Sequence, residues 1–219
     1  MMQPGNTSPP KKALIVFLKP PVKGRVKTRL ARSVGEEQAL AVYRAMVQLT
    51  LKAADESGAE VFAYMSESGD PGFAMPAGFR LRVQQGETLG LRMENAFKEV
   101  FEEGFGKVLI IGSDCPQMSP AVLGEAYRYL DAAPVVAGPA TDGGYFLLGM
   151  TALVPGIFEL ARWSHAQVLD ETLAILQRKR VGYALMSELS DLDDAQDLRR
   201  LSHLLPETVF AGEGEGDKV

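Results

Sequence analysis

The residues best suited to chemistry lie in a cationic loop between Phe17 and Leu30, after a short apolar run. The first 35 residues hold eight Lys or Arg and no Asp or Glu, and the remainder holds 15 bases against 28 acids. Such a glycine-bearing loop, leading into a helix N-terminus, can hold phosphates because main-chain N–H groups add positive potential. A solvated basic surface is the alternative. The candidate phosphate ligands here are Lys19, Gly24, Arg25, Lys27 and Arg29.

A carboxylate, Asp114, follows the apolar run 108–112 within the sequence Gly-Ser-Asp-Cys-Pro. An acid just beyond a buried strand either caps the next turn or acts as a hard oxygen ligand for Mg²⁺ or Mn²⁺ beside nucleotide phosphates. The neighbouring Cys115 is expected to be a small packed residue rather than a reactive thiol.

A glycine pair, Gly143 and Gly144, stands between Asp142 and the start of another apolar run at Tyr145. Adjacent glycines before a strand indicate a close backbone approach, which would suit a wall that presents main-chain groups to an acceptor substrate. A hairpin turn is the alternative, because Asp-Gly is a strong hairpin signal.

Four acids lie within seven residues, from Asp191 to Asp197. Asp193 or Asp194 is a natural N-cap, and acids favour the first turn of a helix. Capping does not explain Asp191, which follows a predicted strand and could reach a metal bound at Asp114.

A fifth candidate segment, residues 84–93, leads into a stretch with helical periodicity. Thr88 is expected to cap that helix, and Arg92 is expected to reach back toward the cleft as a further phosphate ligand. Core packing explains Leu89 and Met93 equally well.

Apolar runs of strand length alternate with segments of helical period, which predicts an α/β three-layer sandwich with a mainly parallel central sheet. Strands are predicted at 13–18, 61–65, 79–84, 108–112, 135–138, 145–148 and 181–186. Helices are predicted at 36–56, 91–101, 119–132, 167–180 and 194–204. Ligands of such sheets bind outside the carboxyl ends of the strands. The basic loop and the turns around Asp114 and Asp142 are expected to share that edge.

Composition sets the remaining limits. The 219 residues suit one domain, predicted at 13–205, between a flexible leader at 1–12 and a disordered tail at 206–219. One cysteine fits a reducing, cytoplasmic compartment. No apolar run approaches the roughly 20 residues that span a bilayer. A net charge of −5 argues against nucleic-acid binding. The oligomeric state is not fixed, and a homodimer stays open.

Together these motifs resemble the nucleotide-diphospho-sugar transferase superfamily. The cationic loop is similar to the opening of 2-phospholactate guanylyltransferase and molybdenum-cofactor guanylyltransferase. The closer resemblance is to an uncharacterised bacterial glycosyltransferase-like family linked to radical-SAM or selenium-related genes and to arsenosugar biosynthesis. It covers about residues 13–204. The matching residues are Lys19, Pro20, Gly24 and 27–30, then Leu89, Gly90, Arg92 and Met93, then 112–116, 142–145, Asp191, Asp193, Asp197 and Leu198.

The resemblance implies a glycosyltransferase-A fold and a nucleotide site that depends on Mg²⁺ or Mn²⁺. It implies that Lys27 and Asp114 are catalytic, and that Asp191 or Asp193 completes the metal site begun by Asp114. The residues implied for the acceptor pocket are Asp142, Gly143, Gly144 and Tyr145. One departure is that Cys115 and Pro116 follow Asp114, so the two-carboxylate Asp-x-Asp motif is absent at this turn.

Three functions are therefore weighed. The first is glycosyl transfer from a nucleotide sugar to a small-molecule acceptor, which the closest resemblance favours. The second is nucleotidyl transfer, in which a nucleoside triphosphate condenses with a phosphorylated acceptor and pyrophosphate leaves. The strongly basic loop suits that triphosphate. The third is nucleotide binding without catalysis on the same fold.

Overall fold

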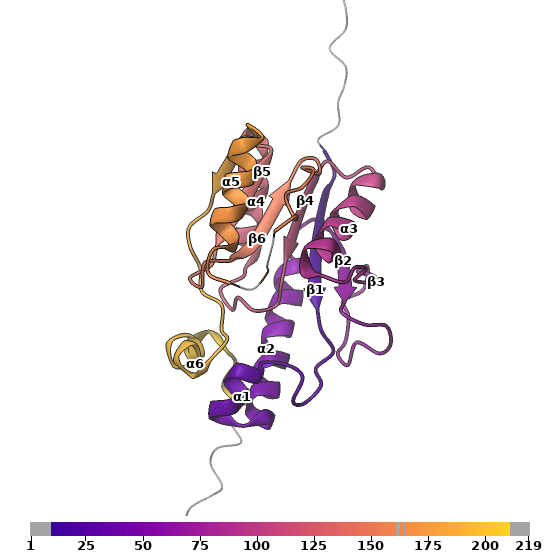
Figure 1. Ribbon diagram of the computed structural model, residues 1–219. Coiled ribbons are helices and arrows are strands. Elements are labelled where there is room, and N and C mark those ends of the chain that lie inside the picture. The colour runs from indigo at the N-terminus through magenta and orange to yellow at the C-terminus, as the bar shows by residue number, and fades with distance from the viewer. Residues whose placement is uncertain (1–9, 161–162, 164, 211–219) are drawn as a thin grey trace, which may run out of the picture.

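The computed structural model describes residues 10–160, 163 and 165–210. One seven-stranded sheet runs through it in the order β3-β2-β1-β4-β6-β5-β7, with helices against both faces (Figure 1). The predicted α/β sandwich with a mainly parallel sheet is confirmed. The strands are β1 (Lys12–Leu18), β2 (Glu60–Met65), β3 (Arg80–Val83), β4 (Lys107–Ile111), β5 (Val135–Pro139), β6 (Tyr145–Met150) and β7 (Tyr183–Leu185).

The central strands are β1 and β4, which pair in parallel, and both are almost wholly buried. They read as continuous apolar runs because helices cover both faces of the sheet there. The strand β6 lies antiparallel between β4 and β5. The turn between β5 and β6 is therefore the hairpin that Asp142-Gly143 indicated.

The helices are α1 (Thr28–Val34), α2 (Glu36–Asp55), α3 (Leu89–Glu102), α4 (Pro120–Ala132), α5 (Val168–Arg178) and α6 (Ala195–Leu201). Short 3₁₀ turns follow at η1 (Ser202–Leu204) and η2 (Glu207–Val209). The predicted caps are confirmed at Thr88 and at Asp194. Ser119, with Pro120 next to it, caps α4. No described helix has the length and apolarity needed to cross a membrane.

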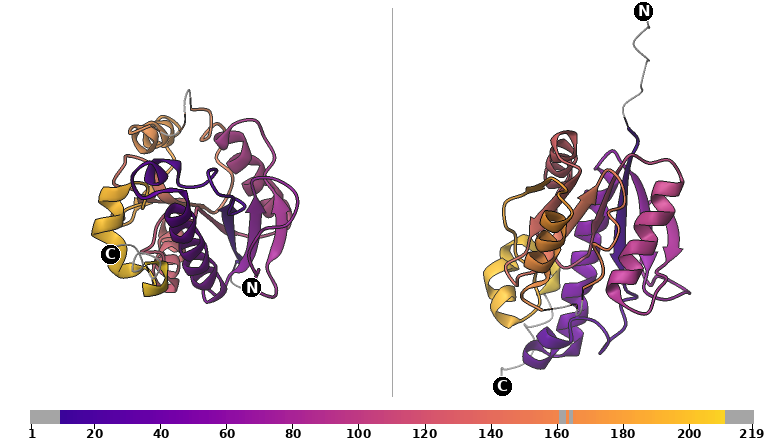
Figure 2. Two further views of the ribbon diagram at one scale, coloured as in Figure 1. Left: turned by 90° about the horizontal axis from the view of Figure 1, so that it is seen from below. Right: turned by 45° about the horizontal axis from the view of Figure 1, so that its top comes forward.

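Two apolar clusters fill the two sides of the sheet. One face of β1 packs against α2 and α4, and the other packs against α3. The helix α5 lies on the α3 side, so three layers result (Figure 2). Alternate residues of β1 divide between the clusters, with Leu14 and Val16 in one and Ala13 and Ile15 in the other.

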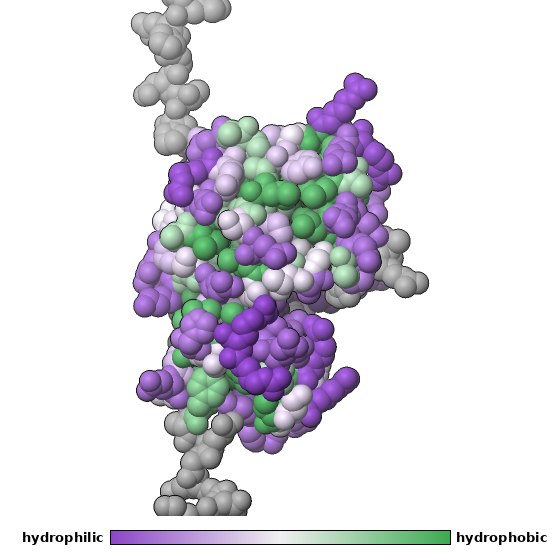
Figure 3. Space-filling view, turned by 90° about the vertical axis from the view of Figure 1, so that its left-hand side faces the viewer, coloured by the Kyte–Doolittle hydropathy of each residue, from purple (hydrophilic) through white to green (hydrophobic). Residues whose placement is uncertain are grey.

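A third apolar cluster contains residues from α1 and α2 together with residues from the last part of the described chain. Leu30 of α1 and the first half of α2 pack against Leu192, Leu198 of α6, and Val209. This lobe lies below the sheet in Figure 1 and stands out as a separate bulge in the space-filling view (Figure 3). It brings the cationic loop, which precedes α1, next to the acidic segment that precedes α6.

Two local predictions differ from the structure. The strand expected at 181–186 is reduced to β7 at the sheet edge, and the helix expected at 194–204 ends its α-helical part at Leu201. The helix α1 was not predicted. It has seven residues, no side-chain cap and no acid in its first turn, so the usual helix signals are missing. Parts of the predicted leader and tail, residues 1–9 and 211–219, lie outside the described residues.

Candidate functional site

A cavity of about 660 Å³ lies at the carboxyl ends of the central strands. Its volume is in the range of small-molecule and cofactor sites. The polar part of its wall comes from segments far apart in the sequence. It includes Lys19, Lys27, Arg92, Asp114, Asp142 and Asp191.

The ammonium group of Lys27 is the most enclosed charge in this site, because the side chain is only 4% exposed. It donates hydrogen bonds to the carboxylate of Asp114, to the main-chain oxygen of Leu192 at 2.6 Å and to Oδ1 of Asp193 at 3.0 Å. Burial lowers the pKa of Lys27, but the charges of Asp114 and Asp193 outweigh it and raise that pKa above its ordinary value. Lys27 is therefore a permanent cation.

The backbone at Lys27 is left-handed, with φ 46° and ψ 44°. A residue with a side chain adopts this conformation at a cost of about 1–2 kcal/mol. The conformation occurs at the N-terminal end of α1, where the chain turns out of the cationic loop. The three contacts of the ammonium group offset this strain and fix the turn.

Tyr43 holds the other cavity lysine of the loop. Its hydroxyl group accepts a hydrogen bond from the main-chain N of Lys19 at 3.0 Å and donates one to the main-chain O of Lys19 at 2.8 Å. Tyr43 faces inward from α2 and also lines the cavity. The helical period of residues 36–56 predicts a buried position for Tyr43 but no contact with Lys19.

Four carboxylates line the cavity, and three of them are the aspartates Asp114, Asp142 and Asp191; the fourth is Glu87. Burial, followed by the negative charges of Asp114 and Asp142, raises the pKa of Asp191 to about 7. The carboxylates in this part of the cavity therefore carry more negative charge than Lys27 neutralises. A divalent cation would relieve that excess.

The oxygen donors of these aspartates decide whether a metal ion can bind in the cavity. Within the described ranges no three His, Cys, Asp or Glu side chains converge closely enough to hold an ion by themselves. Mg²⁺ usually takes one or two protein carboxylates, with water and substrate phosphates as its other ligands. Asp114 and Asp191 fit such a site. Asp193 fits it less well, because its two oxygens pair with Lys27 and Arg29.

Several predicted site residues lie away from the cavity wall. Arg25 pairs with Glu67 at 3.1 Å on the exposed surface. Gly24 has φ +75° beside Glu36. Gly143 has φ +87°, and a Cβ there would lie 2.0 Å from the main-chain O of Ala166, so chain packing requires that glycine. Its neighbours Gly144 and Tyr145 do line the cavity.

An aromatic wall faces the start of α3. Trp163 lines the cavity and stacks on Phe158 with ring centroids 6.4 Å apart. A Cβ at Gly90 would lie 2.7 Å from the indole ring and 2.6 Å from the main-chain O of Phe158. Only glycine at this position lets the helix approach the indole so closely.

Cys115 is buried, as predicted. Burial, and next the charge of Asp191, raises the pKa of its thiol to about 12. The thiol is therefore protonated near neutral pH and packs beside the site without acting as a nucleophile.

Comparison with known proteins gives a family and several structural neighbours. The model of a family described as "Uncharacterized protein conserved in bacteria (DUF2064)" matches residues 37–165. A crystal structure from Desulfovibrio desulfuricans G20, named provisionally as a nucleotide-diphospho-sugar transferase, is 31% identical with a TM-score of 0.81. The alignment covers 87% of this chain and 85% of that one. No curated protein matches the sequence.

Two more distant structures share the fold. Rv0371c from Mycobacterium tuberculosis H37Rv is 18% identical, with a TM-score of 0.58 and coverage of 89% of this chain and 98% of that one. It has also been crystallised in complex with manganese. A nucleotidyl transferase from Methanothermobacter is 17% identical, with a TM-score of 0.58 and coverage of 91% and 98%.

Proposed function

We propose that this chain, which belongs to the bacterial DUF2064 family, is a transferase that uses a nucleotide-activated donor and a divalent metal. The proposed reaction is glycosyl transfer from a nucleotide sugar. The observation that carries the proposal is the meeting of Lys27 and Asp114 in the wall of one cavity. The name of the Desulfovibrio structure supports the donor class. The manganese complex of Rv0371c supports the metal.

The basic and acidic side chains have different roles in the proposed reaction. Lys19 and Lys27 neutralise the phosphates of the donor, and Tyr43 keeps Lys19 in place. Asp114 and Asp191 would hold the metal, which would supply a positive charge shared between protein and phosphate oxygens. Positioning and electrostatic stabilisation then do most of the work, as is usual where a phosphate group leaves.

The acceptor enters from the side of Asp142, Gly144 and Tyr145, which also line the cavity. In glycosyl transfer, the oxygen of an acceptor hydroxyl group forms a bond to the anomeric carbon and loses its proton to solvent, and the bond from that carbon to the nucleoside diphosphate breaks. The leaving diphosphate takes the electron pair, and the cationic side chains stabilise its developing charge.

Nucleotidyl transfer is a second candidate, and the cationic loop favours it. In that reaction an acceptor phosphate attacks the α-phosphorus of a nucleoside triphosphate, and pyrophosphate leaves. A triphosphate carries more negative charge than a nucleotide sugar, which suits the excess of bases near the start of the chain.

Thermal unfolding with a ligand panel tests the proposal, because a ligand that binds the native state raises the melting temperature. The panel contains nucleoside triphosphates, nucleoside diphosphates and nucleotide sugars, each with and without Mn²⁺. We expect a nucleotide-dependent shift that grows with Mn²⁺, falls sharply in Asp114→Asn and persists in the control Asp55→Asn on the exposed end of α2. Absence of any shift in the wild type would reject the proposal.

Product analysis then separates the two reactions and the non-catalytic alternative. Glycosyl transfer releases a nucleoside diphosphate from a nucleotide sugar, whereas nucleotidyl transfer releases pyrophosphate from a triphosphate. A protein that only binds nucleotide releases neither.

A further inference from the structure

Gln84, just after β3, connects the ends of three strands. Its main-chain N donates a hydrogen bond to the main-chain O of Met65 at 2.9 Å. Its side-chain Nε2 donates to the main-chain O of Tyr64 at 3.0 Å and of Leu18 at 3.4 Å. The amide therefore spans the carboxyl ends of β2 and β1, and Gln84 lines the cavity. Its Oε1 atom remains as an acceptor.

Arg92 of α3 uses that acceptor. Its Nη1 donates to Oε1 of Gln84 at 3.3 Å, and its Nε donates to the main-chain O of Gly86 at 2.9 Å. Two contacts on different nitrogens fix the plane of the guanidinium group. The group has five N–H donors, and the other three have no protein partner in the part of the chain that is described.

The loop that contains Gln84 and Gly86 packs closely against α3. Gly86 has φ +134°, and a Cβ there would lie 2.9 Å from Cβ of Leu91 and 3.0 Å from N of Arg92. Asn95 donates a hydrogen bond from Nδ2 to the main-chain O of Gln85 at 2.9 Å. The orientation of Arg92 therefore belongs to the fold and does not depend on a bound ligand.

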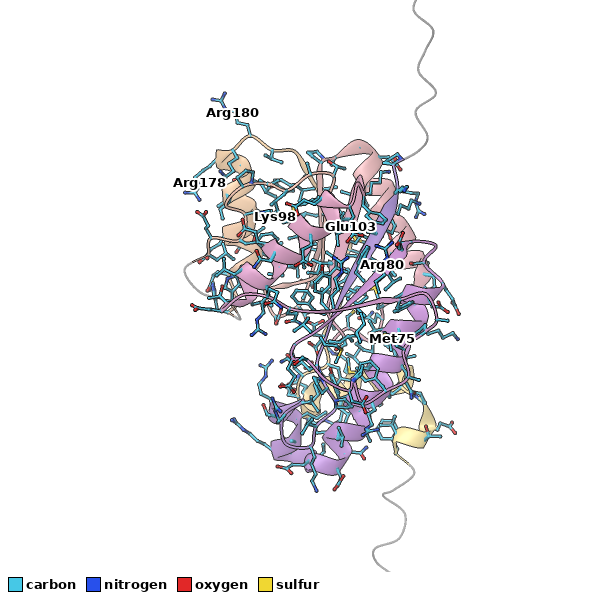
Figure 4. The ribbon with its side chains drawn as sticks, turned by 90° about the vertical axis from the view of Figure 1, so that its right-hand side faces the viewer. Met75, Arg80, Lys98, Glu103, Arg178 and Arg180 are labelled. Carbon is cyan, nitrogen blue, oxygen red and sulfur yellow. The ribbon has the colours of Figure 1, made fainter. Side chains whose placement is uncertain are left out.

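Other arginines on this side of the sheet are paired with acids. Arg80 of β3 pairs with Glu60 and Glu103, and Arg82 pairs with Glu99 and Glu103. Figure 4 labels Arg80 at the start of β3 and Glu103 directly after the end of α3. Arg92, by contrast, forms no ion pair within the described residues, although its guanidinium group lies in the wall of a cavity that also contains Lys19 and Lys27.

We propose that Gln84 is a positioning residue that aims Arg92 into the cavity, and that the free N–H groups of Arg92 bind an oxygen atom of the nucleotide donor. This inference rests on the proposed function. The oxygen belongs either to a phosphate or to a carbonyl of the nucleobase, since both accept hydrogen bonds from a guanidinium fork. Arg92 is thus a second recognition point beside the lysines.

The test is a double-mutant cycle with Gln84→Met, Arg92→Met and the double variant. Affinities for GDP, UDP, CDP and ADP, each with Mn²⁺, and for inorganic pyrophosphate are measured by calorimetry. Each single variant should weaken the best nucleoside diphosphate about tenfold. Gln84→Met should add less than about twofold in the Arg92→Met background, because a positioning residue has no effect without its target. Arg44→Met, on the exposed face of α2, is the matched charge control.

The pyrophosphate measurements identify the oxygen. A parallel loss of pyrophosphate affinity in Arg92→Met assigns the contact to a phosphate, and an unchanged pyrophosphate affinity assigns it to the nucleoside. Unchanged affinity for every probe in Arg92→Met, or independent effects of the two single variants, would overturn the inference.

If Gln84→Met does not fold, Arg92→Met alone still tests whether Arg92 contacts the ligand. Arg92 lies outside the apolar core, so this variant should fold. Failure of the proposed function is a different result. In that case the wild type itself binds none of the probes, and the inference falls with it.

Discussion

Lys27 and Asp114 are separated by 87 positions in the sequence, and the ammonium group of one donates a hydrogen bond to the carboxylate of the other. Asp114 is also a proposed metal ligand. In the ligand-free protein, a lysine therefore occupies a carboxylate that the metal would need. The donor phosphates would compete for the same lysine, so nucleotide and metal should bind with positive coupling.

Replacing Lys27 by Met should raise the affinity for Mn²⁺ in the absence of nucleotide by about tenfold, because a like charge and a competing contact are both removed. Electron paramagnetic resonance of free Mn²⁺ measures this directly. Arg29→Met is the control, since it removes a nearby cation that contacts Asp193 but not Asp114. Equal gains in the two variants would show a general charge effect and no direct competition.

Tyr43→Phe should loosen the cationic loop. The change leaves the main-chain N and O of Lys19 without their hydroxyl partner, which should cost about 1–2 kcal/mol of unfolding free energy. Pyrophosphate affinity should fall at the same time, and urea unfolding with calorimetry measures both. Tyr129→Phe, on a helix away from the cavity, should change neither, and normal pyrophosphate binding in Tyr43→Phe would contradict the role given to this clamp.

Two helical glycines should respond in opposite directions to alanine. Gly124 of α4 has room for a methyl group, with only a flexible arginine atom at 3.8 Å, so Gly124→Ala should stabilise by about 0.5–1 kcal/mol. Gly90→Ala would collide with Trp163 and the main-chain O of Phe158, so it should destabilise the protein and shift tryptophan emission. Trp163 is the single tryptophan, which makes the spectrum specific. Stabilisation by Gly90→Ala with unchanged emission would mean that the aromatic wall is placed differently.

Glu103 should contribute stability that depends on pH. Its hydrogen bond with Arg82 is the main cause that lowers its pKa below the ordinary value of 4.5. A carboxylate with a lowered folded-state pKa stabilises above the unfolded-state pKa, and that contribution is lost as the pH falls through the folded-state value. Glu103→Gln should therefore cost less than about 1 kcal/mol at pH 7, because the group is partly exposed. The difference from wild type should shrink below pH 4.5.

Urea unfolding at pH 7 and pH 3 measures this difference. Glu102→Gln is the matched control, because Glu102 is exposed and forms no ion pair in the described part of the chain. A penalty for Glu103→Gln that stays constant across this range would show that packing, and not charge, is responsible.

The fold could be predicted from the sequence where local pattern decides structure. Continuous apolar runs predicted β1 and β4, and the cap residues Thr88 and Asp194 marked helix starts correctly. The helix α1 escaped prediction because it begins at a left-handed lysine, a conformation for which lysine gives no sequence signal.

The candidate site could be predicted only at the level of strand ends. A parallel sheet brings loops to one edge, so the meeting of the cationic loop with Asp114 followed from topology. The role of Asp193 as a partner of Lys27 and Arg29 depends on distances between the two ends of the chain. Gln84 lies in the candidate segment 84–93, but its role gave no signal, because an amide that donates hydrogen bonds to main-chain oxygens of neighbouring strands looks like any other polar residue in sequence.

The lobe that joins α1 to α6 has a consequence for biosynthesis. Lys27 emerges from the ribosome 165 residues before Leu192 and 166 residues before Asp193, which both accept hydrogen bonds from its ammonium group. A nascent chain that lacks them leaves the ammonium group of Lys27 without two of its three contacts, and it leaves the apolar surface of α2 exposed to chaperones. The cavity wall should therefore be completed only after Asp193 has emerged, so that translation products truncated before that residue carry no assembled site.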